Sequence, residues 1–308
     1  MNQTLSGVFP IAPATFEQDG SYSYEAYQVA ADTIVRGADG ITLFGIAGEY
    51  YKLSGEEERS LLERTISIGH DAGKPVIVSN TKHSTEVAVQ WAKRIESAGA
   101  DCMMILPPFF LKPGPAQILS HMREVASAVS IPVMIQYAPE QTGVPLAPDV
   151  LVELYRAVPN ALYYKIESKP PGHFVSRLQD LTHGEVTIFV GNAGFQLIEG
   201  LDRGAQGVMP GPSLFDIYGT IIRLYRSRKR SLSIRLHKEL VYFLNHIRQS
   251  VEMIIISEKI VLKQRGITGV PGVRRPGYEL DDVDTCLLDE LYATLEREHQ
   301  QILQEAVG

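Results

Sequence analysis

Cysteine is scarce in this chain of 308 residues, which contains only Cys102 and Cys286. One lies in an apolar run and the other near the C-terminus, so the pair offers neither a disulfide framework nor neighbouring ligands for a metal ion. We therefore expect no metal site. Such sparing use of cysteine fits a protein of the reducing cytoplasm, which is the location we predict.

Long apolar runs and an excess of positively charged residues are also missing. No stretch reaches the roughly 18 apolar residues of a membrane-spanning helix, and the first ten residues show no basic leader followed by an apolar segment. The formal net charge is -7 and the pI is near 5.7. Membrane insertion, export and binding to nucleic acid are therefore not expected, because each needs a feature that the sequence lacks.

The chain does contain eight short apolar runs, each followed by a turn with Gly, Pro, Asn or Ser. Segments with apolar residues three and four apart lie between these runs, for example residues 24–35, 54–68, 84–98 and 116–128. This alternation predicts β-α units whose strands are parallel, since each connection has room for one crossover helix. The predicted strands cover residues 7–13, 40–45, 75–81, 102–108, 132–139, 162–168, 187–192 and 207–212.

Eight β-α units favour a closed (β/α)8 TIM barrel. A doubly wound open sheet is the alternative, but no G-x-G-x-x-G follows the first strand. Residues 215–304 continue with a helical pattern, interrupted at 266–277. We predict a catalytic barrel at residues 1–225 and a C-terminal helical extension at 226–308 that packs on the barrel.

Functional residues of a parallel barrel lie at the C-terminal ends of its strands. There the sixth strand, LYYKIES, contains Lys165, which must be buried or point into the barrel. A buried lysine loses the solvation that favours its charge, so a neutral amine becomes available to attack a carbonyl and form an imine. The alternative is that Lys165 reaches solvent or pairs with Glu167.

The second strand ends in FGIAGEYYKLS, residues 44–54. Gly45 and Gly48 allow a tight turn that presents amide donors to an anion such as a carboxylate. Ser54 and Glu57 have the spacing of a capping box at the start of the next helix. A plain connection between strand and helix is an equally good interpretation of this turn.

Several short motifs share one order and spacing with a known family. They are the segment GVFPIAPATF, the turn GIAGE, the two prolines of ILPPFF, the AP-x-x-TG of QYAPEQTG, the lysine of YYKIES, and the glycines at 191 and 207. Together, over residues 5–280, they resemble the dihydrodipicolinate synthase and N-acetylneuraminate lyase family.

This resemblance implies a (β/α)8 barrel with a C-terminal helical extension, assembled as a homo-oligomer, either a tetramer or a dimer. It also implies class I aldolase chemistry on a 2-keto acid such as pyruvate, with no dissociable cofactor because the intermediate is a covalent imine with Lys165. The implied substrate-binding residues are those of the GIAGE turn, which hold the carboxylate, and two that line the floor of the pocket: Gly45, Ile46, Ala47, Gly48, Glu49, Gly191 and Met209.

The sequence departs from the family pattern at the candidate catalytic positions. Ile46 and Ala47 stand where the well-known branches have hydroxylated residues. The family's catalytic tyrosine falls on Gln136, with Tyr137 one position later. Adjacent residues of a strand face opposite ways, so Tyr137 replaces that tyrosine only if the strand end is irregular. We take Lys165, Gln136 and Tyr137 as the candidate catalytic residues.

The sugar-acid branch of the family is the closer match. By position, Gln141 and Phe110 are candidate substrate-binding residues. Dihydrodipicolinate synthases have an arginine and a tyrosine at these two positions, which argues against that synthase activity. The segments PVIVSNTKHST, MIQYAP, YYKIES and NHIRQS instead resemble the 2-keto-3-deoxy-L-arabonate dehydratases. The predicted function is a Schiff-base-forming lyase, an aldolase or a dehydratase, that acts on pyruvate or a 2-keto-3-deoxy sugar acid.

Two residues near the predicted pocket have alternative structural roles. Ser168 follows the lysine, where it could contact substrate or cap the next helix, and Asn192 ends the seventh strand, where it could face the pocket or act as an N-cap. Two other functions also stay open. One is a 4-hydroxy-tetrahydrodipicolinate synthase, and the other is a catalytically silent barrel that binds a keto acid.

Overall fold

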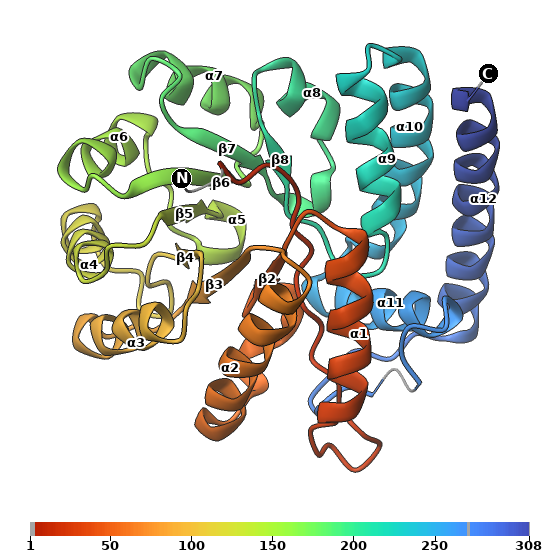
Figure 1. Cartoon of the computed structure of the whole chain (residues 1–308), viewed down its shortest axis with the longest axis horizontal. Coiled ribbons are helices and arrows are strands. Elements are labelled where there is room, and N and C mark those ends of the chain that lie inside the picture. Colours follow the sequence, from red (N-terminus) through yellow and green to blue (C-terminus); the bar gives the residue numbers. More distant parts are fainter. Residues whose placement is uncertain (1–3, 270–271, 308) are drawn as a thin grey trace.

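The computed structural model describes residues 4–269 and 272–307. Eight strands, each one parallel to its neighbours, form a single sheet in the order β1-β8-β7-β6-β5-β4-β3-β2 (Figure 1). The predicted strands are all present, though shorter than the apolar runs. They are β1 (Gly7–Val8), β2 (Ile41–Leu43), β3 (Val76–Asn80), β4 (Cys102–Ile105), β5 (Val133–Tyr137), β6 (Ala161–Ile166), β7 (Thr187–Val190) and β8 (Gly207–Val208).

The sheet closes on itself next to β1. Ile11 forms a parallel bridge with Thr42 of β2, and the N–H of Ala12 donates to the carbonyl of Thr42 at 2.7 Å. These bonds join the first strand region to the second, which completes the ring. The prediction of a (β/α)8 barrel is therefore confirmed.

Helices surround the strands in the predicted alternation (Figure 1). The predicted capping box of α2 is present, because the Ser54 hydroxyl accepts from the N–H of Glu57 and the Glu57 carboxylate accepts from the N–H of Ser54. The barrel helices are α1 (Tyr24–Gly37), α2 (Gly55–Asp71), α3 (Thr85–Ser97), α4 (Pro115–Ser127), α5 (Pro139–Thr142), α6 (Pro148–Ala157), α7 (Gly172–Leu181), α8 (Leu197–Asp202) and α9 (Phe215–Arg226), with single 3₁₀ turns η1 (Ile46–Gly48), η2 (Tyr50–Lys52) and η3 (Asn192–Gly194).

Alternation along the strands divides the core into two layers. One apolar cluster fills the inside of the barrel, and a larger one lies between the strands and the helices. On β6, Tyr163 belongs to the inner cluster and Tyr164 to the outer one. Lys165, two residues after Tyr163, therefore points into the barrel, where its amine reaches the C-terminal opening.

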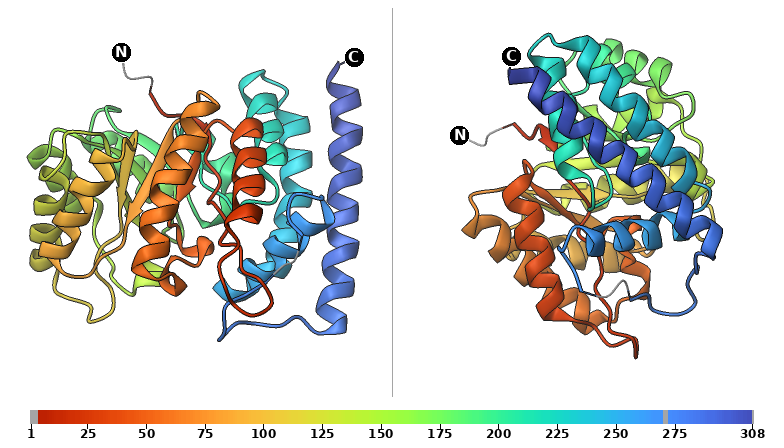
Figure 2. Two further views of the ribbon diagram at one scale, coloured as in Figure 1. Left: turned by 60° about the horizontal axis from the view of Figure 1, so that its bottom comes forward. Right: turned by 90° about the vertical axis from the view of Figure 1, so that its right-hand side faces the viewer.

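The C-terminal extension consists of α10 (Arg230–Ile247), α11 (Val251–Gln264) and α12 (Asp282–Val307). Helix α12 packs along α10 at the outer side, while α11 lies against η1 (Figure 2). The extension thus reaches the barrel opening, while the division of the chain at residue 225 stays a prediction. Within the described part of the chain, no helix combines the length and the apolar character needed to cross a membrane.

Candidate active site

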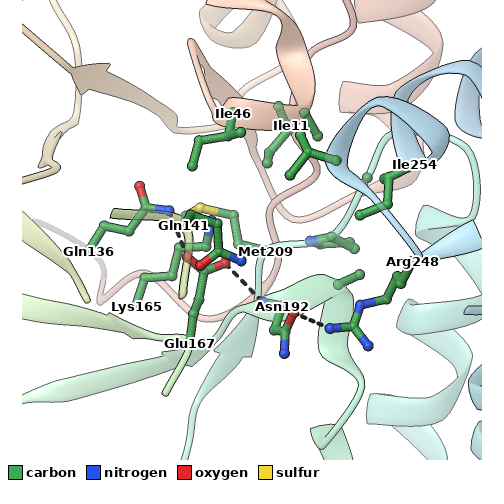
Figure 3. Close-up of a pocket in the computed structure, with 15 residues that line it drawn as sticks. Ile11, Ile46, Gln136, Gln141, Lys165, Glu167, Asn192, Met209, Arg248 and Ile254 are labelled. Atoms are coloured by element: carbon green, nitrogen blue, oxygen red, sulfur yellow. Dashed lines mark hydrogen bonds and ion pairs between the residues drawn. The ribbon is translucent and has the colours of Figure 1, made fainter. Parts of the chain in front are cut away.

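A cavity opens at the C-terminal ends of the strands (Figure 3). Its wall combines residues of the barrel loops with residues of the C-terminal extension. The lining residues are Ile11, Ile46, Ala47, Gln136, Gln141, Lys165, Glu167, Asn192, Ala193, Met209, Pro210, Gly211, Arg248, Val251 and Ile254. This is the position at which (β/α)8 barrels carry their active sites.

Lys165 is the central polar residue of this cavity. Its side chain is 3% exposed, and its Nζ lies 3.4 Å from Oε1 of Glu167. Burial and the ion pair, which sequence reasoning presented as alternatives, therefore occur together. A carboxylate next to a reactive amine can exchange protons with it and with whatever is attached to it.

Glu167 is fixed by two further hydrogen bonds. Its Oε2 accepts from Nε2 of Gln136 at 2.8 Å, and its Oε1 accepts from the backbone N–H of Asn192 at 2.9 Å. The carboxylate is thus held between β5 and the loop after β7, facing Lys165. The structure therefore places Glu167 in the cavity wall.

Gly191 makes room for this carboxylate. A Cβ at position 191 would lie 2.1 Å from Cγ of Glu167, which no side chain can tolerate. The glycine is therefore needed for the close approach of Glu167, and no left-handed backbone conformation is involved. Gly191 itself does not line the cavity, which corrects its prediction as a residue of the pocket floor.

Strand alternation separates Gln136 from Tyr137. Gln136 lines the cavity and pairs across the sheet with Lys165, whereas the ring of Tyr137 lies in the outer layer, stacked on Phe174 with 4.5 Å between centroids. The Tyr137 hydroxyl accepts a hydrogen bond from the N–H of Leu146. The inclusion of Tyr137 among the candidate catalytic residues is therefore corrected, since its strand end is regular and points it away from the site.

The GIAGE turn contributes Ile46 and Ala47 to the cavity wall. Its glycines allow close packing, because a Cβ at Gly45 would meet Ile11 at 2.7 Å and one at Gly48 would meet the carbonyl oxygen of Ala12 at 2.7 Å. The turn thus packs tightly on the segment that follows β1. Gly45 and Gly48 do not line the cavity, which corrects their prediction as substrate-binding residues.

Glu49 does not face the cavity, which corrects its prediction as a substrate-binding residue. Its side chain is 0% exposed and forms ion pairs with Lys259 of α11 and, at 3.1 Å, with Lys52. The Lys259 ammonium also donates to the carbonyl of Gly272 at 2.8 Å. Two cations surround a carboxylate that would otherwise be buried without compensation, so Glu49 holds α11 against the turn.

The remaining predicted residues divide into two groups. Gln141, Asn192 and Met209 line the cavity, and the buried Oε1 of Gln141 has no hydrogen-bond partner among the described residues. Phe110 and Ser168 do not line it. Phe110 is 79% exposed on the loop before α4, and Ser168 is buried next to β6. Their predicted contact with substrate is therefore not supported within this chain.

Sequence reasoning did not single out Arg248, although it belongs to the NHIRQS segment that resembles the dehydratases. This arginine follows α10 and lines the cavity. Its guanidinium donates to Oδ1 of Asn192 and lies over the ring of Phe195, 4.5 Å from the centroid. An arginine at a helix C-terminus is ordinarily explained by favourable contact with the last carbonyls of the helix. Only the three-dimensional path of the extension brings it to the barrel opening.

A closed barrel with a buried lysine beside a carboxylate, in a cavity at the strand ends, defines an enzyme of the (β/α)8 class. The model of the Dihydrodipicolinate synthetase family matches residues 4–295, and the chain belongs to this family. Its members are lyases, among them dehydratases, aldolases and synthases, so this chain is a lyase.

Relatives with two different activities align over nearly the whole chain. The L-2-keto-3-deoxyarabonate dehydratase of Azospirillum brasilense is 28% identical over 89% of this chain and 89% of its own length. The 4-hydroxy-tetrahydrodipicolinate synthase of Bacillus subtilis is 25% identical over 91% of this chain and 96% of its own. The crystal structure of the dihydrodipicolinate synthase from Rhodopseudomonas palustris covers 94% of this chain and 97% of its own, with a TM-score of 0.85 and 26% identity.

Proposed function

We propose that this chain is a Schiff-base-forming dehydratase of 2-keto-3-deoxy sugar acids. The observation that supports the proposal most strongly is the position of Lys165, buried in the cavity with the Glu167 carboxylate 3.4 Å from its amine. No dissociable cofactor is needed, because the imine itself activates the substrate. The protein acts on a small 2-keto acid, and we propose that it works as a homo-oligomer in the cytoplasm.

The first step is imine formation. The neutral amine of Lys165 attacks the C2 carbonyl, a C–N bond forms, and the carbonyl oxygen leaves as water. The resulting iminium withdraws electrons from C3 and makes its protons acidic.

Glu167 is placed for the proton transfers that follow. C3 is only two bonds from the imine nitrogen, so a carboxylate 3.4 Å from Nζ lies within reach of the C3 proton. After Glu167 removes this proton, an enamine forms. When the C4–O bond breaks, the same carboxyl returns the proton to the departing hydroxyl, and water leaves.

Gln136 orients Glu167 and does not titrate. Its amide donates to Oε2 of Glu167, and a carboxamide neither gains nor loses a proton in the accessible pH range. Aldol cleavage would instead require a base for the hydroxyl on C4. The tyrosine that serves the well-known family members is absent from this position, which favours dehydration over cleavage.

The test is a product assay with 2-keto-3-deoxy pentonates and hexonates. We expect loss of the C4 hydroxyl by NMR without release of pyruvate, and a decrease in turnover of about 10² to 10⁴-fold in Glu167→Gln. Glu153→Gln, at an exposed position of α6, is the matched control. Release of pyruvate as the main product would contradict dehydration. Turnover of pyruvate plus aspartate semialdehyde at about 10 per second would favour the synthase activity instead.

A further inference from the structure

The charged side chains of the cavity wall are Lys165, Glu167 and Arg248. Lys165 and Glu167 form an ion pair, whereas Arg248 has no carboxylate within ion-pair distance among residues 4–269 and 272–307. The two carboxylates whose charges act on Arg248 have partners of their own, since Glu140 pairs with Lys169 at 2.5 Å and Glu167 pairs with Lys165 at 3.4 Å. One cation of the cavity is therefore left without a counter-charge.

The guanidinium of Arg248 is held in one orientation. It donates to Oδ1 of Asn192 and stacks over Phe195, while Val251 and Ile254 form the apolar wall next to it. A planar guanidinium fixed in this way keeps several N–H donors free, and it loses little further conformational entropy when it binds a planar anion. Arg248 is thus preorganised for a ligand.

Arg248 lies across the cavity from the imine-forming end. Figure 3 shows Lys165, Glu167 and Gln136 on one side and Arg248 on the other, with Asn192 between them. In a bound 2-keto acid the C1 carboxylate is bonded to the imine carbon, so it must lie next to Lys165. A group that reaches Arg248 therefore belongs to the opposite end of the substrate chain.

We propose that Arg248 binds a second carboxylate at the distal end of the substrate, so that the preferred substrates are 2-keto-3-deoxy sugar diacids. This inference rests on the proposed Schiff-base function. A carboxylate matches the guanidinium in both charge and geometry, whereas a hydroxyl would leave the cation without a counter-charge in a partly desolvated site. The ligand class is thus a chain of five or six carbons with an acid at each end.

The experiment compares matched keto acids that form an imine but cannot lose water. The pairs are 2-oxoglutarate with 2-oxopentanoate and 2-oxoadipate with 2-oxohexanoate, each differing only in the distal carboxylate. The concentration for half-maximal trapping by borohydride is read from the intact mass. We expect the full chain to prefer the diacid of at least one pair by about 10 to 100-fold, the range of a charge-assisted hydrogen-bonded pair.

In Arg248→Gln this preference should disappear, so that the two members of each pair are trapped at equal concentrations when each is measured relative to pyruvate, which has no distal group. Arg248→Lys should recover part of the preference, and Arg177→Gln, at an exposed position of α7, is the control. An equal loss for both members of each pair, measured relative to pyruvate, would overturn the distal assignment. Absence of trapping by every keto acid would instead overturn the proposed function.

Discussion

At the scale of single residues, the glutamine at position 136, where the resembling family has its catalytic tyrosine, most alters the expected chemistry. Its amide can orient Glu167 but cannot carry a proton. We therefore expect Gln136→Ala to lower turnover by about 10 to 100-fold. Tyr137→Phe should leave turnover nearly unchanged, because the tyrosine ring lies in the outer layer and its hydroxyl bonds only the N–H of Leu146. Steady-state kinetics of the two variants measure this difference.

The opposite pattern would be informative. An inactive Tyr137→Phe together with a nearly normal Gln136→Ala would place the tyrosine in the cavity. That result would contradict the assignment of Gln136 to the cavity side of β5 and of Tyr137 to its outer side. The unfolding midpoint of each variant separates loss of activity from loss of stability.

Gly191 allows a second test at this scale. A methyl group at this position would collide with Cγ of Glu167 at 2.1 Å, while the backbone conformation suits any residue. We expect Gly191→Ala to fold and to lose activity about as strongly as Glu167→Gln, because it displaces the carboxylate from Lys165. Gly219→Ala in α9, where only the flexible end of Arg223 is near, should keep full activity. A fully active Gly191→Ala would show that the position of Glu167 is not critical.

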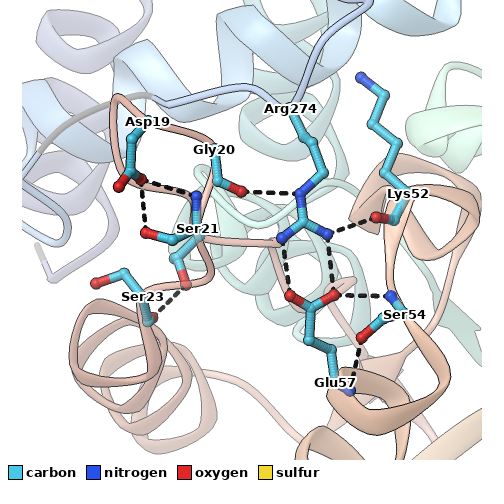
Figure 4. Close-up of polar contacts among 9 residues, drawn as sticks. Asp19, Gly20, Ser21, Ser23, Lys52, Ser54, Glu57 and Arg274 are labelled. Atoms are coloured by element: carbon cyan, nitrogen blue, oxygen red, sulfur yellow. Dashed lines mark hydrogen bonds and ion pairs between the residues drawn. The ribbon is translucent and has the colours of Figure 1, made fainter.

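At the scale of elements, Arg274 joins the segment after α11 to two loops of the barrel. Its guanidinium donates to both carboxylate oxygens of Glu57 and to the carbonyls of Lys52 and Gly20 (Figure 4). It also lies over the ring of Phe16, 4.4 Å from the centroid. This cluster holds the C-terminal extension next to the GIAGE turn, and hence next to the cavity.

The cluster predicts a dependence of stability on pH. The hydrogen bond from Arg274 is the main cause that lowers the pKa of Glu57 from 4.5 to about 2. Since the folded state holds the proton less tightly than the unfolded state, the stabilisation is complete above pH 4.5 and is lost as the pH falls towards 2. A shift of this size corresponds to about 3 kcal/mol in the free energy of unfolding.

Glu57→Gln should therefore cost about 3 kcal/mol near pH 6 and almost nothing near pH 2, as measured by denaturant unfolding across this range. Glu63→Gln on the same helix is the control, because Glu63 pairs with Arg94 at the exposed surface. A cost for Glu57→Gln that does not change with pH would show that the ion pair with Arg274 is not its source.

Elements with strong periodicity could be predicted from the sequence. All eight strands, the first four helices and the capping box of α2 lie where the pattern of apolar and turn residues places them. Side chains whose direction depends on tertiary contacts could not be predicted in this way. Glu49 turns away from the cavity because Lys259 of α11 compensates its charge, and that lysine is 210 residues away in the sequence.

At the scale of the whole molecule, the C-terminal extension completes the site. Residues of α11 and the end of α10 form the outer wall of a cavity whose floor belongs to the barrel. Lys165 and Gln136 could be assigned to that floor from strand periodicity and from the family resemblance. Arg248 was not assigned to the cavity, because neither a helical pattern nor the resemblance of the NHIRQS segment tells where the end of this helix lies relative to the barrel.

The central claim is that Lys165 forms an imine with a 2-keto acid, and borohydride reduction in the presence of pyruvate tests it most directly. We expect the intact mass to increase by one reduced pyruvate adduct, and peptide mapping to place this adduct on Lys165. Lys165→Ala should show no adduct. An adduct on another lysine, such as Lys82 or Lys112, or an unchanged mass of the original protein, would contradict the account.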